Sequence, residues 1–393
     1  MIRKTRTLGA LVGVLTLGSL AACGGSGSGA AAESDCVVKI GSIFSQTGAA
    51  SAFGSDGERS IKMAIDEVNA DGFEVDGNTC TFDYKATDLA SDPNNAASVA
   101  QDLITGFEAQ FVFGPDMAAA VPPVATAVQR DGDVMLLSLS TGMDAYAGKG
   151  EPFFRLNPTD VRMVNEGYIP AVAEQLPDVK RLAMLMTDDE VGRALAEGYA
   201  DAFEKAGIEV VQTEYFDPTT TNFAPIAQRV DDGVDGFFIG YNNDGNAAGI
   251  IDAAIEAGLP PVVITRGISA LPGADRIDKL DAYTWLVIGA DPLYPATDEQ
   301  KAFNSKFMET FDIEEGRMTY FPYSHYDYVG MLVQAMKEAG STTDIAAISD
   351  ALKGATYEGV LPVSFDDEGL NTTPMGLGVI RDGEGNVVTF GGN

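Results

Sequence analysis

The feature that most constrains how this chain folds is a regular alternation of short apolar runs with longer amphipathic segments, starting at Cys36. The apolar runs have the length of buried strands and are residues 37–44, 81–86, 111–114 and 134–138. The amphipathic segments repeat apolar residues three and four positions apart, as helices do, and are residues 54–70, 94–104 and 118–129. Strands that alternate with helices in this way predict a parallel sheet with helices on both faces.

The same alternation restarts beyond residue 150. The strand-like runs are residues 153–156, 181–186, 208–216, 236–240, 261–265 and 283–288, and the helix-like segments are residues 161–175, 191–206, 223–230 and 246–257. Further helices are predicted at 298–310, 323–340 and 343–354, followed by strands and turns over 357–390. These last elements are too few for a domain with its own sheet, so we expect them to complete both α/β units.

The predicted fold class is therefore α/β, with two Rossmann-like lobes built on parallel sheets and joined by a hinge that the chain crosses more than once. We assign residues 36–155 and about 290–357 to the first lobe, and residues 156–289 and about 358–393 to the second. Ligands bind such sheets at the carboxyl ends of their strands, so the expected site is a cleft between the lobes.

The N-terminus has the features of an export signal. Basic residues at positions 3, 4 and 6 precede an uncharged apolar stretch over 8–22, which is short for a membrane span. The stretch ends in Leu-Ala-Ala-Cys, which resembles a bacterial lipobox. We expect residues 1–22 to be a lipoprotein signal peptide, Cys23 to carry the lipid, and residues 23–35 to be a flexible tether. The protein would then be extracytoplasmic and lipid-anchored to the bacterial cell membrane; an ordinary signal peptide with an incidental cysteine is the alternative.

The two remaining cysteines, Cys36 and Cys80, each stand just before a strand-like run. If the two strands are parallel neighbours, their sulfur atoms lie side by side at one edge of the sheet. An exported compartment favours oxidation, so we expect a Cys36–Cys80 disulfide. The alternative is a pair of separate buried thiols.

Composition and motifs argue against catalysis, metal binding and nucleic-acid binding. Asp and Glu number 58 against 25 Lys and Arg, and the net charge of −33 would repel a phosphate backbone. His325 is the single histidine, so one chain cannot supply two histidine ligands, and a Ser-His-Asp triad would have to use this residue. The sequence has no P-loop, no G-x-S-x-G and no G-x-G-x-x-G that opens a helix after a strand. We expect no enzyme activity, no cofactor and no metal, and interpret His325 as a packing or cleft residue.

Small polar residues follow several of the predicted strands. These loops are residues 45–48, 115–118, 138–142, 188–190 and 242–244. The carboxyl ends of parallel strands meet at one edge of a sheet, so hydroxyl, amide and carboxylate groups there suit hydrogen bonding to a small polar ligand. The alternative is that they only cap the helices that follow, because Ser, Thr, Asn and Asp are good caps.

In their order and spacing, several motifs resemble the leucine/isoleucine/valine-type periplasmic substrate-binding proteins of ABC importers, which have the type I fold. They extend over about residues 37–390 and include Ile40-Gly-Ser-Ile-Phe-Ser-Gln-Thr-Gly48, Phe53-Gly54, Asp92-Pro93, Val112-Phe-Gly114, Pro122-Pro123 and Tyr326-Asp327. The resemblance implies two lobes, three hinge crossings, capture of a small ligand by closure, and delivery to a separate permease with ATPase subunits. We expect a monomer.

Carried over residue by residue, the resemblance implies ligand contacts in several loops. In amino-acid binders of the family an aromatic residue in the first loop covers the ligand, and Phe53 matches. Beside Met117, Ala118 replaces the serine that usually takes the ligand carboxylate, so only its backbone N–H could serve. The other residues that match in kind are Ser138, Ser140 and Thr141 in the first lobe, and Tyr241, Asn242 and Asn243 in the second.

The chain departs from this pattern after the strand at 261–265, where the family usually has an acid for the ligand ammonium and this chain has Arg266. Either Asp116, Asp188 or Asp244 holds the ammonium of an amino acid, or the ligand lacks an ammonium. In the second case it is a small aromatic or aliphatic acid, or a related amide, with Arg266 on its carboxylate. A third interpretation is that Arg266 faces solvent or pairs with a surface acid. The alternative to an import protein is a ligand sensor that feeds a membrane receptor.

Overall fold

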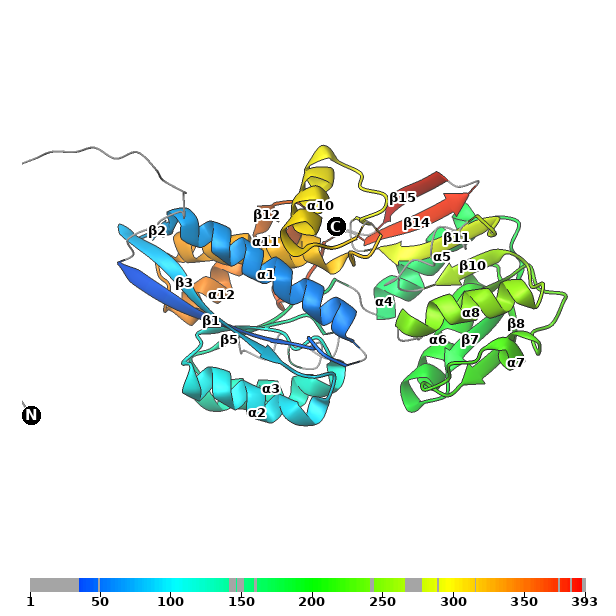
Figure 1. The fold of residues 1–393 in the computed structure, drawn as a ribbon, viewed down its shortest axis with the longest axis horizontal. Helices are drawn as coiled ribbons and strands as arrows, with labels where there is room; N and C mark the ends of the chain where they lie inside the picture. Colours follow the sequence, from blue (N-terminus) through cyan, green and yellow to red (C-terminus); the bar gives the residue numbers. More distant parts are fainter. Residues whose placement is uncertain are drawn as a thin grey trace, which may run out of the picture.

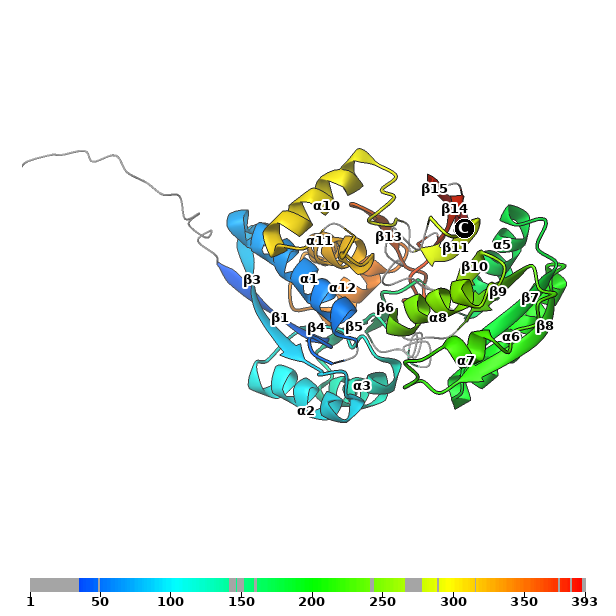
Figure 2. The same cartoon turned by 45° about the vertical axis from the view of Figure 1, so that its right-hand side comes forward.

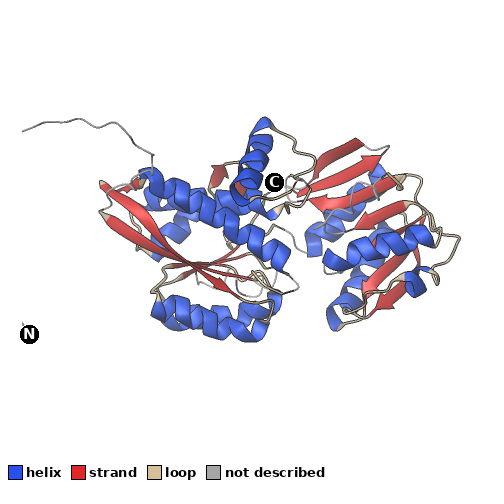
Figure 3. Ribbon diagram, in the orientation of Figure 1, coloured by secondary structure: helices blue, strands red, loops and turns tan. Residues whose placement is uncertain are grey.

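The computed structural model describes residues 35–48, 50–140, 146, 152–158, 161–240, 244–265, 278–287, 290–314, 316–373, 375–381 and 384–390. Two α/β units lie side by side along the long axis of the molecule (Figure 1). Helices cover both faces of each sheet (Figure 3), and a turn of 45° shows the same two units (Figure 2). The predicted fold class, an α/β protein with two Rossmann-like units, is confirmed.

The first sheet contains six strands in the order β2-β3-β1-β4-β5-β6. Their bounds are β1 Cys36–Phe44, β2 Phe73–Val75, β3 Asn78–Asp88, β4 Phe111–Phe113, β5 Met135–Ser138 and β6 Phe153–Arg155. All neighbours are parallel except β2 and β3, which form an antiparallel hairpin. The five parallel strands therefore end at one edge of the sheet.

Two helical layers enclose the first sheet. On one face α1 Ser51–Asp71, α11 Phe321–Ala339 and α12 Ile345–Leu352 share an apolar core with the sheet, and α10 Asp298–Phe311 packs on α1 and α11. On the other face lie η1 Pro93–Asn95, α2 Ala96–Gln101, η2 Asp102–Gly106, η3 Ala118–Ala120 and α3 Val121–Asp131. The single helix predicted over 94–104 is thus a 3-10 turn, an α-helix and a π-turn in succession.

The second sheet contains seven strands in the order β15-β14-β11-β10-β9-β7-β8. Their bounds are β7 Arg181–Thr187, β8 Glu209–Phe216, β9 Gly236–Ile239, β10 Val262–Thr265, β11 Ala282–Val287, β14 Met375–Arg381 and β15 Glu384–Phe390. One face carries α4 Val161–Met163, η5 Val164–Tyr168, α5 Ile169–Gln175 and α6 Glu190–Lys205; the other carries α7 Ala224–Ala227 and α8 Asp244–Glu256. β14 and β15 are antiparallel, so both sheets are mixed, whereas we expected parallel sheets.

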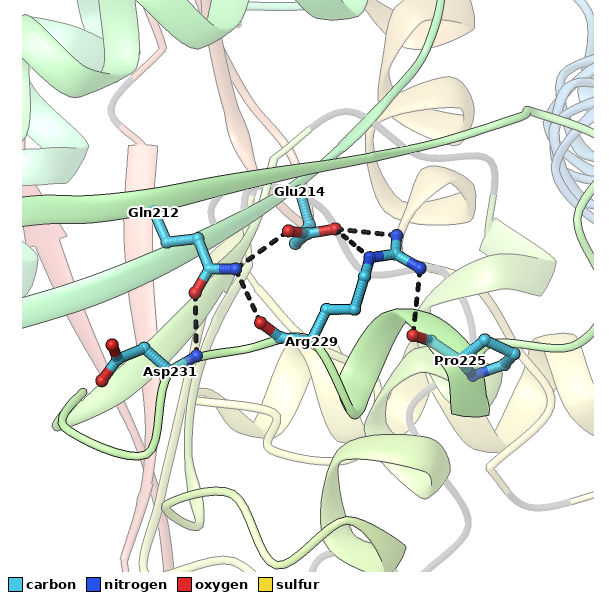
Figure 4. A network of polar contacts seen from close by, with 5 residues as sticks. All are labelled: Gln212, Glu214, Pro225, Arg229 and Asp231. Atoms are coloured by element: carbon cyan, nitrogen blue, oxygen red, sulfur yellow. Dashed lines mark hydrogen bonds and ion pairs between the residues drawn. The ribbon is translucent and has the colours of Figure 1, made fainter.

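The edge strand β8 is tied to the segment that follows α7 by a polar network (Figure 4). Gln212 donates to Glu214 (2.9 Å) and to the carbonyl oxygen of Arg229 (2.8 Å), and accepts from the backbone N–H of Asp231 (2.8 Å). The Arg229 guanidinium in turn donates to Glu214 (2.8 Å) and to the carbonyl oxygen of Pro225 (3.0 Å). The network covers a sheet edge with side chains, as unpaired edges require.

The chain passes between the two units three times: after β6, after β11 and after β13 Pro362–Ser364. The first and third passages are joined at the carbonyl oxygen of Leu156, which accepts hydrogen bonds from Tyr328 (2.5 Å) and Asn371 (2.6 Å). Backbone hydrogen bonds between Arg155 and the 369–371 segment add to this connection. The first and third passages are therefore paired segments rather than independent linkers.

The expected return to the second lobe at about residue 358 is wrong. Residues 356–364 form a hairpin of β12 Thr356–Glu358 and β13, and Val363 and Phe365 lie in the core of the first unit. The carboxylate of Asp327 on α11 accepts from the backbone N–H groups of Val360 (3.0 Å) and Leu361 (2.7 Å) and fixes the hairpin to that helix. The chain joins the second sheet only at β14.

Cys36 and Cys80 are register partners on the neighbouring parallel strands β1 and β3, with Cα atoms 4.6 Å apart, and they form a disulfide. The expected signal peptide, the lipidated Cys23 and most of the tether lie outside the described residues. Among the helices that the structure describes, none is long and apolar enough to cross a membrane.

Candidate functional site

The first sheet has a switch point between β1 and β4. β1 pairs with β3 on one side and with β4 on the other, and the connections that follow these strands diverge to opposite faces of the sheet. Diverging connections leave a hollow at the carboxyl ends of the strands. A pocket of about 300 Å³ lies there, and the residues that line it are Phe44, Ala50, Phe53, Asp116, Ala118, Leu139, Ser140, Asn157, Tyr320, Phe321 and His325.

Asp116 joins the loops that follow β1 and β4. Its carboxylate accepts hydrogen bonds from the backbone N–H of Ser45 (2.9 Å) and from the Ser45 hydroxyl (3.1 Å). The first turn of α1 packs so closely on this loop that a Cβ at residue 54 would lie 2.1 Å from the carbonyl oxygen of Ser45. Glycine at this position therefore lets α1 bring Phe53 to the pocket wall.

Aromatic residues form the wall opposite the sheet. The ring of Phe53 meets the ring of Phe321 edge-on, with centroids 5.1 Å apart, and Tyr320 lies 4.6 Å from Phe321. The edge-to-face contact of Phe53 with Phe321 is favourable and fixes the angle between these two rings. Tyr320 and Phe321 belong to the start of α11, almost three hundred residues after Phe44.

Polar contacts from α1 hold this aromatic segment on both sides. Before it, Asp56 accepts from the backbone N–H (2.9 Å) and the hydroxyl (3.0 Å) of Thr319. After it, the hydroxyl of Ser60 donates to the carbonyl oxygen of Pro322 (2.5 Å). These bonds position Tyr320 and Phe321 without occupying the pocket, so this part of the site is preorganised.

The end of β5 supplies the polar base of the pocket. The hydroxyl of Ser138 is fully buried, donates to the carbonyl oxygen of Pro115 (3.3 Å) and accepts from the backbone N–H of Ser140 (3.2 Å). Ser138 thus links the loops after β4 and β5 from below. Ser140 and Leu139 line the pocket above it.

His325 lies against the aromatic wall with 1% of its surface exposed. Its Nδ1 lies 2.8 Å from the carbonyl oxygen of Phe321, and its ring packs on Phe44, Phe321 and Tyr328. Burial lowers the pKa of His325 to about 3, while the hydrogen bond to Phe321 opposes this shift. The imidazole is therefore neutral at physiological pH.

Asp116 is the acidic residue of the pocket wall. Burial raises the pKa of this carboxyl, and the hydrogen bonds from Ser45 act in the opposite direction. Among the lining residues that the structure describes, Asp116 is the only one with a carboxyl group. This wall suits a ligand group that donates hydrogen bonds, an ammonium above all.

The predicted ligand-binding residues divide into four groups. Phe53, Ala118 and Ser140 line the pocket; Ser138 is buried beneath it; and Met117 packs in the apolar layer of α2 and α3. The predicted residues that lie outside the described part of the chain are Thr141, Tyr241, Asn242, Asn243 and Arg266.

The structure describes the side chains of two of the three candidate acids for a ligand ammonium, and the third, Asp244, is the first residue of α8. Asp116 lines the pocket, whereas Asp188 pairs with Arg193 (2.6 Å) on the second unit. Sequence reasoning did not include Phe44, Ala50, Leu139, Asn157, Tyr320 or Phe321 in the site. For Phe44 and Leu139, the position at the ends of predicted strands could have indicated a role in the site. The other four residues carried no such signal. Within the described residues, no group of His, Cys, Asp and Glu side chains is arranged to hold a metal ion.

Comparison with known proteins agrees with this architecture. A family model described as periplasmic binding protein matches residues 37–384. The chain therefore belongs to the periplasmic binding protein family. A curated relative in Brucella abortus, the Leu/Ile/Val-binding protein homolog 8, is 26% identical over 309 residues, which cover 75% of this chain and 74% of the relative.

Two solved structures share the fold. One is a branched-chain amino acid transporter substrate-binding protein from Streptococcus pneumoniae in complex with isoleucine; its TM-score is 0.73 at 21% identity, covering 90% of this chain and 99% of the other. The second is an ABC transporter solute-binding protein from R. palustris in complex with 4-hydroxybenzoate; its TM-score is 0.72 at 22% identity, covering 91% and 97%. Of these two proteins, one thus binds an amino acid and the other binds an aromatic acid.

Proposed function

We propose that this protein is an extracytoplasmic solute-binding lipoprotein. It captures a small ligand between its two lobes and delivers it to the permease of an ABC importer. The observation that carries this proposal is the pocket at the switch point of the first sheet, which is open to a ligand and lined by aromatic rings and one carboxylate. Family membership supports binding rather than catalysis as its role.

The favoured ligand is an amino acid whose side chain is largely apolar. The rings of Phe53, Tyr320 and Phe321 offer an apolar surface to the side chain, and Asp116 offers an acceptor to the ammonium. A buried ammonium needs such a partner, because an unpaired charge in a closed cleft is costly. The groups best suited to bind the ligand carboxylate are the backbone N–H of Ala118 and the segment around Ser140.

A small aromatic acid is the second candidate. The observation that favours it is the predominance of aromatic rings in the lining, including Phe44 below the wall. In this case Asp116 would keep its bonds to Ser45 and face a hydroxyl or a water molecule, and the ligand carboxylate would depend on groups of the second lobe.

Closure and anchoring complete the proposal. The three passages between the units, of which the first and third are joined at Leu156, form a hinge about which the second unit can cover the pocket. The lipid on Cys23 and the tether that follows would hold the protein at the membrane beside its permease. We propose that it works there as a monomer.

A ligand screen tests this function. Residues 24–393 are heated with single amino acids, benzoate and 4-hydroxybenzoate, and hits are measured by calorimetry. A ligand at a hundredfold excess over its Kd stabilises the fold by about 2.7 kcal/mol. Phe53→Ala should weaken binding of the hit at least tenfold, by loss of roughly 1.5–3 kcal/mol of apolar contact.

Phe107→Ala is the matched control, because Phe107 is also half-buried in the first unit but packs by Lys39 and Lys85, away from the pocket. Equal affinity of the Phe53 and Phe107 variants would show that the ligand does not use this pocket. Absence of any stabilising ligand in the screen would contradict the ligand classes named above.

A further inference from the structure

We infer that His325 determines ligand specificity by accepting, at its Nε2, a hydrogen bond from a hydroxyl group on the body of the ligand. This inference rests on the proposed function and adds to it a chemical requirement for the ligand. The structure supports it through the tautomer of the ring, the surroundings of Nε2 and the position of the ring in the pocket.

The tautomer follows from one contact. A carbonyl oxygen only accepts hydrogen bonds, and the carbonyl oxygen of Phe321 lies 2.8 Å from Nδ1 of His325. Nδ1 must therefore carry the proton. In the neutral imidazole that burial favours, Nε2 then has a free lone pair and can only accept.

Nε2 lies on the side of the ring that faces Gly57 of α1. A Cβ at residue 57 would come within 3.0 Å of Nε2, so only glycine leaves this nitrogen uncovered by a side chain. Within the part of the chain that the structure describes, Nε2 has no hydrogen-bond donor. The residue is 99% buried, but Nε2 is not one of the fully buried polar atoms that lack a partner, so it keeps some access to a small donor.

The donor that we propose is a ligand in the pocket. His325 lines it together with Phe44, Phe53 and Phe321, so the part of a ligand that reaches the ring is its apolar body. Asp116, on the β4 loop, is the acceptor for a charged donor. Nε2 is neutral, accepts a hydrogen bond and lies among aromatic rings, so the donor that suits it is a neutral hydroxyl. A site that hydrogen-bonds a ligand hydroxyl discriminates against the analogue that lacks it.

The test uses two ligand pairs that differ by one hydroxyl: tyrosine with phenylalanine, and 4-hydroxybenzoate with benzoate. Wild-type protein should prefer the hydroxylated member by about tenfold or more. His325→Gln places an amide oxygen near the position of Nε2 and should keep the preference. His325→Asn keeps a donor near the position of Nδ1 for Phe321 but has no acceptor at the Nε2 position, and should lose the preference.

A purely structural role predicts the opposite order, because Asn preserves the contact with Phe321 and Gln does not. An Asn variant that keeps the preference would therefore overturn the inference. Equal binding of both members of a pair by the wild type would overturn it as well.

A second measurement does not depend on the variants folding. His325 is the only histidine, so ¹⁵N-histidine labelling gives one pair of ring signals. The ligand-free protein should show protonated Nδ1 and bare Nε2, and the hydroxylated ligand should shift the Nε2 signal. A protonated Nε2 in the ligand-free protein would overturn the inference.

The outcomes separate the inference from the function on which it rests. Binding of leucine or isoleucine but of neither hydroxylated probe would support a solute-binding protein and overturn the role of His325. Binding of none of the probes would contradict the proposed ligand classes, and the ring signals of the ligand-free protein would still decide whether Nε2 is a free acceptor.

Discussion

Gly54 and Asp116 show how single residues shape the pocket. Gly54 lets α1 approach the Ser45 loop, and Asp116 fixes the same loop from the other side of the switch point. Neither residue has to touch the ligand to control the site. Their effect is transmitted through Ser45, which both of them contact.

Gly54→Ala should disrupt this arrangement. The added Cβ would lie 2.1 Å from a backbone oxygen, which cannot move as a flexible side chain can. We expect a loss of stability of about 1–3 kcal/mol, as for other overpacked sites, and weaker ligand binding. Chemical unfolding and calorimetry measure the two effects.

Gly198→Ala on α6 is the control. Its new Cβ would make one ordinary contact at 3.5 Å, to the side chain of Asn165, so the better helix propensity of alanine should leave stability unchanged or raised. If Gly54→Ala is as stable as Gly198→Ala and binds ligand normally, the close packing of α1 on the Ser45 loop is not required.

Asp327 gives the protein a pH dependence that can be isolated. Burial raises the pKa of this carboxyl from 3.8 to about 7, although the N–H groups of Val360 and Leu361 act against the shift. The folded protein therefore binds a proton that the unfolded chain does not between pH about 4 and 7. The contribution of Asp327 to stability is full below pH about 4 and is lost as the pH rises through 7.

Asp327→Asn should remove this contribution. Between pH 5 and 7 the wild type should gain stability over the variant by up to ~1.4 kcal/mol for each pH unit of acidification. Asp291, with a pKa of about 6, acts in the same direction as Asp327, and the buried neutral His325 acts in the opposite direction, but both are present in the two proteins. Urea unfolding at several pH values measures the difference. Parallel pH profiles would contradict this role for Asp327.

At the scale of elements, the strands that carry the site were predictable and the aromatic wall was not. Buried apolar runs ended where β1, β4 and β5 end, so residues such as Ala118 and Ser140 could be placed at one edge of the sheet. Tyr320 and Phe321 reach this edge only through the folding of α11 onto α1, and no local pattern marks such a contact.

Two hairpins were less predictable than these strands. The hairpin of β2 and β3 turns at Asp76-Gly77, where both residues have positive φ, and Asp-Gly is a typical signal for a two-residue turn. The signal was present, but three residues are too few for β2 to show a periodicity. The position of the 356–364 hairpin depends on Asp327, whose partners are backbone groups that a sequence does not reveal.

The link between β1 and β3 gives a prediction at this scale. The disulfide closes a loop with a sequence separation of 44 residues, which corresponds to about 3–4 kcal/mol of stability in the chain-entropy model. Replacing both Cys36 and Cys80 by Ser should lower the free energy of unfolding by this amount. Thiol titration of unreduced, denatured residues 24–393 should find no free thiol, and two reactive thiols would refute the pairing.

At the scale of the whole molecule, the two sheets and the three passages between them define what the pocket can do. The pocket is built from the first unit and from residues at its border with the passages, such as Asn157. A pocket that is built from one unit gains affinity for its ligand when the second unit covers it and excludes water. The hinge is therefore as much a part of the proposed function as the aromatic wall.

Small-angle X-ray scattering of residues 24–393, with and without a saturating ligand from the screen, tests capture between the lobes most directly. The radius of gyration should fall when the ligand binds to the wild type and to Phe107→Ala. At the same ligand concentration the fall should be smaller for Phe53→Ala, in proportion to the fraction of this variant that calorimetry shows to be bound. Identical scattering curves for the free protein and for protein that calorimetry shows to be fully bound would contradict closure of the two lobes on the ligand.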